Sequence, residues 1–150
     1  MKDISLIVVP VDLDQNTQKL VDFAISMANK LGSEIAFFHS VQPIESVAMG
    51  EMAMVHFSYD EFNTAHITQA EESLAEFIKN AEVKCEKCRS KVVLGDAVDT
   101  ILDFAKNENA DMIIMGTHGK RGLEKILLGS VAHRVLQNGP CPVLVMNPYK

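Results

Sequence analysis

Three glycines and a serine in the last third of the chain have the spacing of a phosphate-binding loop. Gly116 and Gly119 are separated by two residues, and nine further residues lead to the pair Gly129-Ser130. Glycines let the backbone approach an anion closely, and the amides at a helix start point toward it. The serine adds a hydroxyl donor. The pattern therefore predicts a site for the phosphates of a ligand.

The flanking sequence places this loop between a strand and a helix. The apolar run 112–115 precedes it and indicates a buried strand, and a helical pattern begins at Val131. Ser130 could cap that helix, bind phosphate, or do both, since both uses draw on the same amides. Lys120 and Arg121 bring positive charge, as phosphate contacts or as solvated loop residues. We interpret Gly122 as a plain turn glycine.

The rest of the chain alternates strands with helices, which predicts an open parallel sheet covered on both faces. We expect strands at 4–11, 35–41, 92–94, 112–115 and 143–146. Apolar residues at helical spacing predict helices over 20–31, 67–81, 98–105 and 131–136. Gly32 and Gly139-Pro140 are stop signals, and Asp96 is a candidate N-cap.

Length and composition exclude several classes of protein. The chain has 150 residues, which fits a single domain over 1–150. A net charge of −6 argues against a general nucleic-acid-binding surface. No apolar run is long enough for a membrane span, and the amino-terminal residues lack a signal-peptide profile. Three cysteines without a secretory segment favour reduced thiols in a cytoplasm.

Asp12 directly follows the first buried strand, so its carboxylate should lie at the mouth of a site beside the sheet. It could accept hydrogen bonds from a ligand hydroxyl or amino group. The alternative is a turn or helix-capping aspartate, which the nearby Asp14 and Asn16 support. The spacing alone leaves both readings open.

Four separated landmarks together resemble one known family. They are the glycine loop, the segment 8–12 (Val-Val-Pro-Val-Asp), the segment 38–41 (Phe-His-Ser-Val) and the segment 140–145 (Pro-Cys-Pro-Val-Leu-Val). In this order they resemble the ATP-binding branch of the universal stress protein family, over nearly the whole chain. The resemblance implies an α/β fold, Rossmann-like and similar to the adenine nucleotide alpha hydrolases. Its open five-stranded parallel sheet would have the order 3-2-1-4-5, with helices on both faces.

That strand order makes the first and fourth strands neighbours whose connections leave in opposite directions. Such a switch point is where ligands bind in open α/β sheets. The resemblance implies ATP as the ligand, with Mg²⁺ or Mn²⁺. It assigns nucleotide contacts to Pro10, Val11, Asp12, Val41, Met115, Gly116, Gly119, Gly129, Ser130 and Val131. We expect the ribose and α-phosphate near Gly116 and the outer phosphates between Gly119 and the Gly129-Ser130 pair.

Other chemistry-bearing residues receive plainer interpretations. His118 and His133 have no recognisable nucleophile as a partner, so we assign no catalytic residue and no resident metal ligand. Cys85 and Cys88 lie in a charged segment and are expected as separate surface cysteines, with a dithiol switch or a metal site as alternatives. The connector 42–63 is expected to pack against the domain, with a partner contact or a cover over the nucleotide as alternatives.

These readings lead to one leading function and two alternatives. The leading one is a cytoplasmic, ATP-binding regulatory or stress-response protein that forms a homodimer through the last strand, Val143–Met146, with neither nucleic acid nor membrane as a partner. An apolar strand at a sheet edge tends to pair with another chain. The first alternative is a slow ATPase or adenylyl-transfer enzyme of the same fold group. The second is an interaction module that binds no nucleotide.

Overall fold

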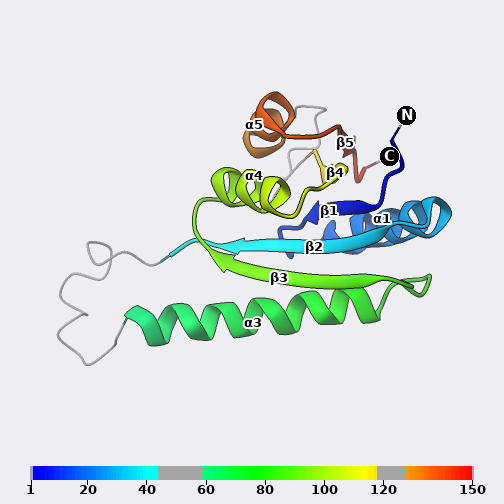
Figure 1. Cartoon of the computed structure of the whole chain (residues 1–150). Coiled ribbons are helices and arrows are strands. Elements are labelled where there is room, and N and C mark those ends of the chain that lie inside the picture. Colours follow the sequence, from blue (N-terminus) through cyan, green and yellow to red (C-terminus); the bar gives the residue numbers. More distant parts are fainter. Residues whose placement is uncertain (1, 44–58, 118–127, 150) are drawn as a thin grey trace.

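The computed structural model describes residues 2–43, 59–117 and 128–149. Its five strands are β1 (Leu6–Pro10), β2 (Glu34–Val41), β3 (Cys88–Leu94), β4 (Met112–Gly116) and β5 (Val143–Met146). They form one sheet in the order β3-β2-β1-β4-β5, and every neighbouring pair is parallel. The fold class and strand order expected from the resemblance are therefore confirmed (Figure 1).

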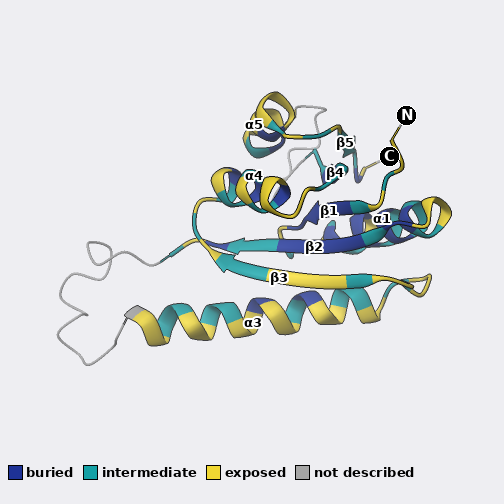
Figure 2. Cartoon of the chain, in the orientation of Figure 1, coloured by how far each residue is buried: buried dark blue, intermediate teal, exposed yellow. Residues whose placement is uncertain are grey.

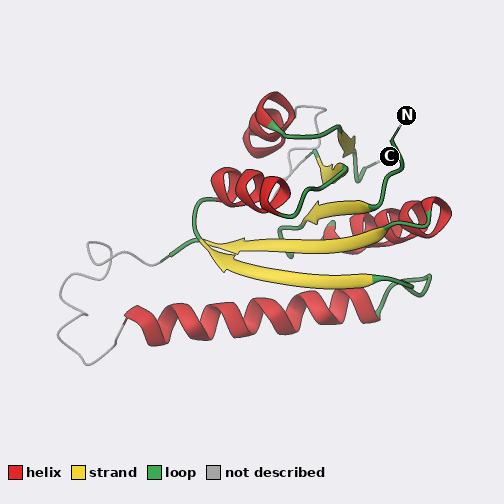
Figure 3. Cartoon of the chain, in the orientation of Figure 1, coloured by secondary structure: helices red, strands yellow, loops and turns green. Residues whose placement is uncertain are grey.

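The described helices are α1 (Thr17–Leu31), α3 (Tyr59–Lys79), α4 (Ala97–Asn107) and α5 (Ser130–Asn138). Helices α1 and α3 cover one face of the sheet, whereas α4 and α5 cover the other. Figure 3 shows these layers, with the long helix α3 running beside β2 and β3. None of the helices in the described ranges is long and apolar enough to cross a bilayer.

Two separate cores hold these layers together, because successive strand residues point to opposite faces. On the first face, Val9 and Phe37 pack against Val21 and Ala24 of α1 and Leu74 of α3. On the second face, residues one position away in the strands pack against α4 and α5; they are Val8, Ala36, Phe38, Ile113 and Met115. The central strands are thus buried on both sides (Figure 2), which explains their continuous apolar runs.

The residues predicted to start or stop helices lie at helix ends in the structure. Gly32 ends α1 in the left-handed conformation, with φ of 71°, which costs glycine little. Asp96 caps α4, since its carboxylate accepts a hydrogen bond from the Asp99 amide at 3.0 Å. Gly139 follows α5 as its C-cap.

Two elements begin much earlier than the sequence indicates, whereas β1 (Leu6–Pro10) is shorter at both ends than the predicted strand at 4–11. β3 begins at Cys88 rather than at position 92, because Arg89, Ser90 and Lys91 are exposed on an edge strand and carry no apolar signal. Arg89 instead pairs with Glu34 at 2.6 Å and with Glu108 at 3.0 Å, and these contacts raise the pKa of its guanidinium. Helix α3 begins at Tyr59, well before the apolar stripe that starts at position 67.

The expectations of reduced thiols and of two separate surface cysteines are both wrong for Cys85 and Cys88. Cys85 and Cys88 form a disulfide across the turn between α3 and β3. Both are half-buried and pack against the core on the α1/α3 face. The sequence could not show this, because the charged residues around them mask their contact with the core.

Candidate functional site

A cavity of about 1030 Å³ lies at the carboxyl ends of the strands. The ends of β1, β2 and β4 form its floor, and residues from all four described helices form its walls. β1 and β4 are adjacent in the sheet, whereas their following helices α1 and α5 lie on opposite faces. The cavity therefore occupies the topological switch point of the sheet.

Nine of the ten residues assigned from sequence line this one cavity. They are Pro10, Val11, Asp12, Val41, Met115, Gly116, Gly129, Ser130 and Val131. The tenth, Gly119, lies outside the described residues, as do His118, Lys120, Arg121 and Gly122. The structure thus brings together segments that are more than one hundred positions apart in the chain.

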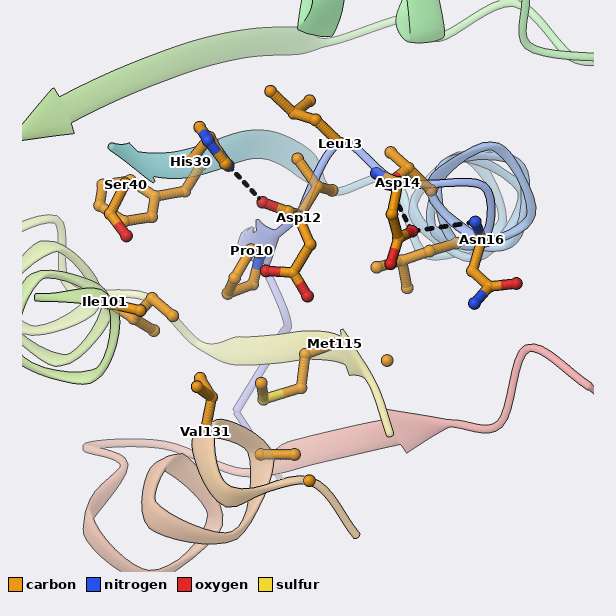
Figure 4. A pocket seen from close by; sticks show the side chains of 18 of the residues that line it. Pro10, Asp12, Leu13, Asp14, Asn16, His39, Ser40, Ile101, Met115 and Val131 are labelled. Carbon is orange, nitrogen blue, oxygen red and sulfur yellow. Dashed lines mark hydrogen bonds between the residues drawn. The ribbon is translucent and has the colours of Figure 1, made fainter. Parts of the chain in front are cut away.

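Asp12 stands at the point where β1 gives way to the cavity. Its side chain is exposed and extends toward the side of the cavity where Met115 and Val131 lie (Figure 4). The next residue, Leu13, has φ of 60°, a left-handed conformation that is uncommon for a residue with a branched side chain. The positive φ of Leu13 changes the direction of the chain after β1. Backbone strain of this kind is concentrated at binding sites.

Asp14, two residues further on, makes the turn into α1. Its Oδ1 accepts a hydrogen bond from the Asn16 amide at 2.9 Å, and its own amide donates to Thr17 Oγ1 at 2.9 Å. The sequence left open which of these polar residues forms the turn, and in the structure Asp14 forms it.

The ends of β1 and β2 are tied together at the cavity floor. The Val11 amide donates to the Phe38 carbonyl at 2.8 Å. His39 Nδ1 lies 2.7 Å from the Val11 carbonyl oxygen, which can only accept, so the ring carries its proton on Nδ1. Figure 4 shows His39 on the opposite side of these strand ends from Met115 and Val131. The backbone of Val11, directly before Asp12, is therefore fixed on both of its edges.

The two described ends of the glycine loop, Thr117 and Gly129, lie next to each other. Thr117, directly after β4, donates its amide to Met146 at 2.9 Å, and Gly129 donates to the Thr117 carbonyl at 2.8 Å. Gly129 is the N-cap of α5, and Ser130 is its first helical residue. Within the described residues, no side chain caps the first turn of α5, and that turn holds no acidic residue. The reading of Ser130 as the capping side chain is therefore wrong.

Sequence reasoning missed one wall of the cavity, which α3 provides. His66, Gln69, Ala70 and Ser73 line it and share one face of the helix, because their spacing follows the helical repeat. The ring of His66 meets that of Phe62 edge-on, with centroids 4.9 Å apart. This polar spacing was visible in the sequence, but the apolar stripe of α3 dominated the interpretation.

The charges on the described cavity lining are negative. Asp12 and Asp14 line it, whereas no lysine or arginine does so in the part of the chain that the structure describes. Favourable interactions for an anion on this lining therefore come from helix-end amides. His133 is exposed on α5 and does not line the cavity, as expected for a residue on the polar face. No cluster of three metal-binding side chains occurs in the described ranges.

Comparison with known proteins gives a consistent picture. The family model described as "Universal stress protein family" matches residues 4–147. A universal stress protein of Methanocaldococcus jannaschii is 33% identical over 144 residues, covering 96% of this chain and 82% of the relative. The solved structure of universal stress protein UspA from Lactobacillus plantarum superposes with a TM-score of 0.80 at 20% identity, covering 98% of this chain and 100% of that one. A universal stress protein solved in complex with cAMP has a TM-score of 0.63 at 19% identity, with coverage of 98% and 99%.

Proposed function

Because the chain belongs to the universal stress protein family, we propose that it binds an adenine nucleotide, ATP with Mg²⁺, in the cavity at the switch point. The observation that carries this proposal is the pairing of two features across one cavity. The uncapped start of α5 lies on one side, and the Asp12 loop lies on the other. A nucleotide has one chemical group suited to each.

The start of α5 is suited to phosphate. The first amides of a helix lack intrahelical acceptors and carry a partial positive charge. In α5 the N-cap is a glycine, so the backbone of Gly129 and Ser130 is accessible to an anion. The Ser130 hydroxyl supplies a further donor. The charged side chains of the described lining are acidic and do not neutralise phosphate. Under the proposal, Mg²⁺ bound with the nucleotide offsets the remaining phosphate charge.

The opposite side of the cavity is suited to a nucleoside. The Asp12 carboxylate is an acceptor for a ribose hydroxyl or for the adenine amino group. Met115 and Ile101 provide apolar surface for the base, and the Val41 backbone lies at the same edge of the sheet. One structural neighbour of this chain was solved with cAMP, which is an adenine nucleotide, and this supports the class of ligand.

Titration calorimetry with ATP and Mg²⁺ tests the proposal. We expect saturable binding with one nucleotide per chain, and no detectable heat at millimolar nucleotide would refute it. Adenosine as titrant separates the nucleoside contribution from that of the phosphates. Turnover measured on the same samples distinguishes a binding protein from a slow ATPase.

Two matched variants locate the site. Asp12→Asn keeps the shape of the side chain but removes its charge, so we expect affinity to fall by about tenfold. His133→Ala is the control, since His133 is exposed on α5 and outside the cavity. Equal affinity in wild type and Asp12→Asn would remove Asp12 from the site.

We further propose that nucleotide occupancy regulates a cytoplasmic homodimer formed through β5. β5 is an edge strand, and its four residues are half-buried. The carbonyls of Pro142 and Met146 accept bonds from the β4 side, so the alternate residues Val143 and Val145 direct their amides to the open edge. Such an edge favours pairing with a second copy.

Sedimentation at micromolar concentration, with and without ATP, tests this assembly. The wild type should have the mass of a dimer. Val145→Pro removes one outward amide while leaving the bonds to β4, so it should shift the protein toward the monomer. A monomeric wild type in both conditions would contradict the proposal.

A further inference from the structure

The disulfide between Cys85 and Cys88 lies at the end of the molecule opposite the cavity. It closes the turn between the end of α3 and the amino end of β3, whereas the cavity lies at the carboxyl ends of the strands. Figure 1 shows that this turn and the carboxyl end of β3 are at opposite ends of the sheet. The two Cα atoms are 5.9 Å apart, within the usual range for a disulfide. Only two residues separate the cysteines, so the short chain between them limits how far apart they can lie in space.

The turn is held in place by contacts that do not involve sulfur. Asn29 of α1 donates its side-chain amide to the Lys84 carbonyl at 3.0 Å. The Glu82 amide donates to Asp22 at 3.2 Å. The Ile35 amide of β2 donates to the Lys87 carbonyl at 2.8 Å. Because α1 and β2 hold the backbone on both sides of the pair, we expect the two sulfur atoms to remain neighbours when their bond is broken.

The surroundings give a small reagent access to the pair. Glu86 and Lys87, which lie between the cysteines, are exposed, whereas the cysteines themselves are half-buried. Each cysteine directly follows a lysine, Lys84 before Cys85 and Lys87 before Cys88, and a neighbouring ammonium group favours the reactive thiolate. The remaining cysteine, Cys141, packs against the core of the opposite face. Burial, and after it the charge of Asp111, raises the pKa of the Cys141 thiol, which makes it the less reactive one.

We propose that Cys85 and Cys88 form a reversible dithiol–disulfide site that exchanges with small disulfides of the glutathione type. One cysteine thiolate attacks a sulfur of the small disulfide, forms a mixed disulfide and releases one small thiol. The second cysteine thiolate then attacks the sulfur of the first, closing the Cys85–Cys88 bond and releasing the second small thiol. The protein loses two electrons and two protons, and the small disulfide gains both.

Cysteine counting by mass spectrometry tests the site. The full-length protein is equilibrated in buffers of glutathione and glutathione disulfide at a series of ratios, quenched with acid, unfolded and alkylated. The wild type should pass from three alkylated cysteines to one as the ratio becomes oxidising, and should return to three in the reducing buffer. Cys141→Ser should pass from two to none. Cys85→Ser has two thiols, Cys88 and Cys141, and there should be no ratio at which both become protected from alkylation in one step.

A comparison of native with urea-unfolded protein tests the role of the anchored turn. If α1 and β2 hold the sulfurs together, the native protein should form the disulfide at a more reducing ratio than the unfolded protein. Equal midpoints would show that the fold does not prepare the site. Three alkylated cysteines at every ratio, bonds that link different molecules, or a bond that the thiol buffer never reopens would each overturn the proposal.

Discussion

Two helices begin at the same cavity, and their first turns are built differently. Ala97, the first residue of α4, and Ser130, the first residue of α5, both line it. At α4 the Asp96 carboxylate accepts from the Asp99 amide, and the Thr100 hydroxyl donates to the Asp96 carbonyl at 2.7 Å. At α5 the N-cap is a glycine, and no capping side chain is present within the described residues.

This difference separates a structural helix end from one that is available for binding. A helix start needs an acceptor for its first amides, and Asp96 supplies one within the chain. The first turn of α5 also needs an acceptor, which under our proposal is a nucleotide phosphate. Under this proposal, the same backbone chemistry contributes to stability at α4 and to ligand binding at α5.

Making α5 resemble α4 should produce the largest effect. Gly129 has φ of −62° and ψ of 157°, an extended conformation that aspartate adopts without strain. In Gly129→Asp the new carboxylate would cap the helix and repel phosphate. We expect nucleotide affinity to fall by about tenfold or more, while the free energy of unfolding rises by up to about 1 kcal/mol. Calorimetry and urea unfolding measure the two changes.

The opposite signs make this prediction strict. A loss of affinity together with a loss of stability would indicate damage to the fold rather than competition at the amides. Gly129→Asn provides the neutral control, since it caps without the charge and should weaken binding less.

Removing the cap of α4 is the converse change. Asp96→Ala should lower the free energy of unfolding by about 1 kcal/mol, because the first-turn amide loses its acceptor. Nucleotide affinity should change little. Asp96→Asn retains a capping oxygen and should remain close to wild type in urea unfolding. If Asp96→Ala weakened nucleotide binding as strongly as Gly129→Asp, the proposed division between the two helices would be wrong.

Ser130→Ala should have a smaller effect, confined to binding. The hydroxyl contributes one donor to phosphate, so we expect affinity to fall by a few-fold, corresponding to about 1 kcal/mol. Stability should be unchanged, because the side chain caps no amide in this structure. A clear loss of stability, with unchanged affinity, would return Ser130 to a structural role.

Asp111 shows within this chain how a carboxylate responds to backbone amides. The Lys2 ammonium lies 3.0 Å from it, and the amides of Leu6 and Ser5 donate to it at 3.1 and 2.9 Å. In this order of importance they lower its pKa below the usual 3.8. Its contribution to stability is therefore present above about pH 4 and is lost as the pH falls through the lowered pKa.

Asp111→Asn should accordingly be less stable than wild type at neutral pH, by the smallest margin of these variants. The difference should shrink as both proteins are brought to acidic pH. Urea unfolding at pH 7 and near pH 3 measures it. A difference that is independent of pH would mean that the charge of Asp111 contributes nothing.

The sequence predicted the architecture because the buried strands and amphipathic helices carry strong periodic signals. Gly32, Asp96 and β5 (Val143–Met146) were placed correctly, since each depends on local chemistry. β3 was predicted too short, because its first residues are exposed on an edge strand. They pair with β2 through their backbone, so they need no apolar side chains and leave no apolar pattern in the sequence. The strand order came from the resemblance, since alternation of elements alone does not determine it.

The candidate site was predicted from its motifs but not in its full extent. Asp12, Gly129 and Ser130 could be assigned because aspartate, glycine and serine have recognisable roles at strand and helix ends, whereas Pro10, Val11 and Val131 came only from the family resemblance. His66, Gln69 and Ser73 were not assigned, because their contribution arises only when α3 packs across the sheet. The left-handed conformation of Leu13 had no signal either, since leucine rarely adopts it.

Amide chemical shifts during titration with ATP and Mg²⁺ test the central claim most directly. We expect the amides of Ser130, Val131 and Ala132 at the start of α5 to shift strongly and saturably, while the Asp99 amide, held by Asp96, shifts little. Saturable binding that leaves the α5 amides unmoved would contradict the account.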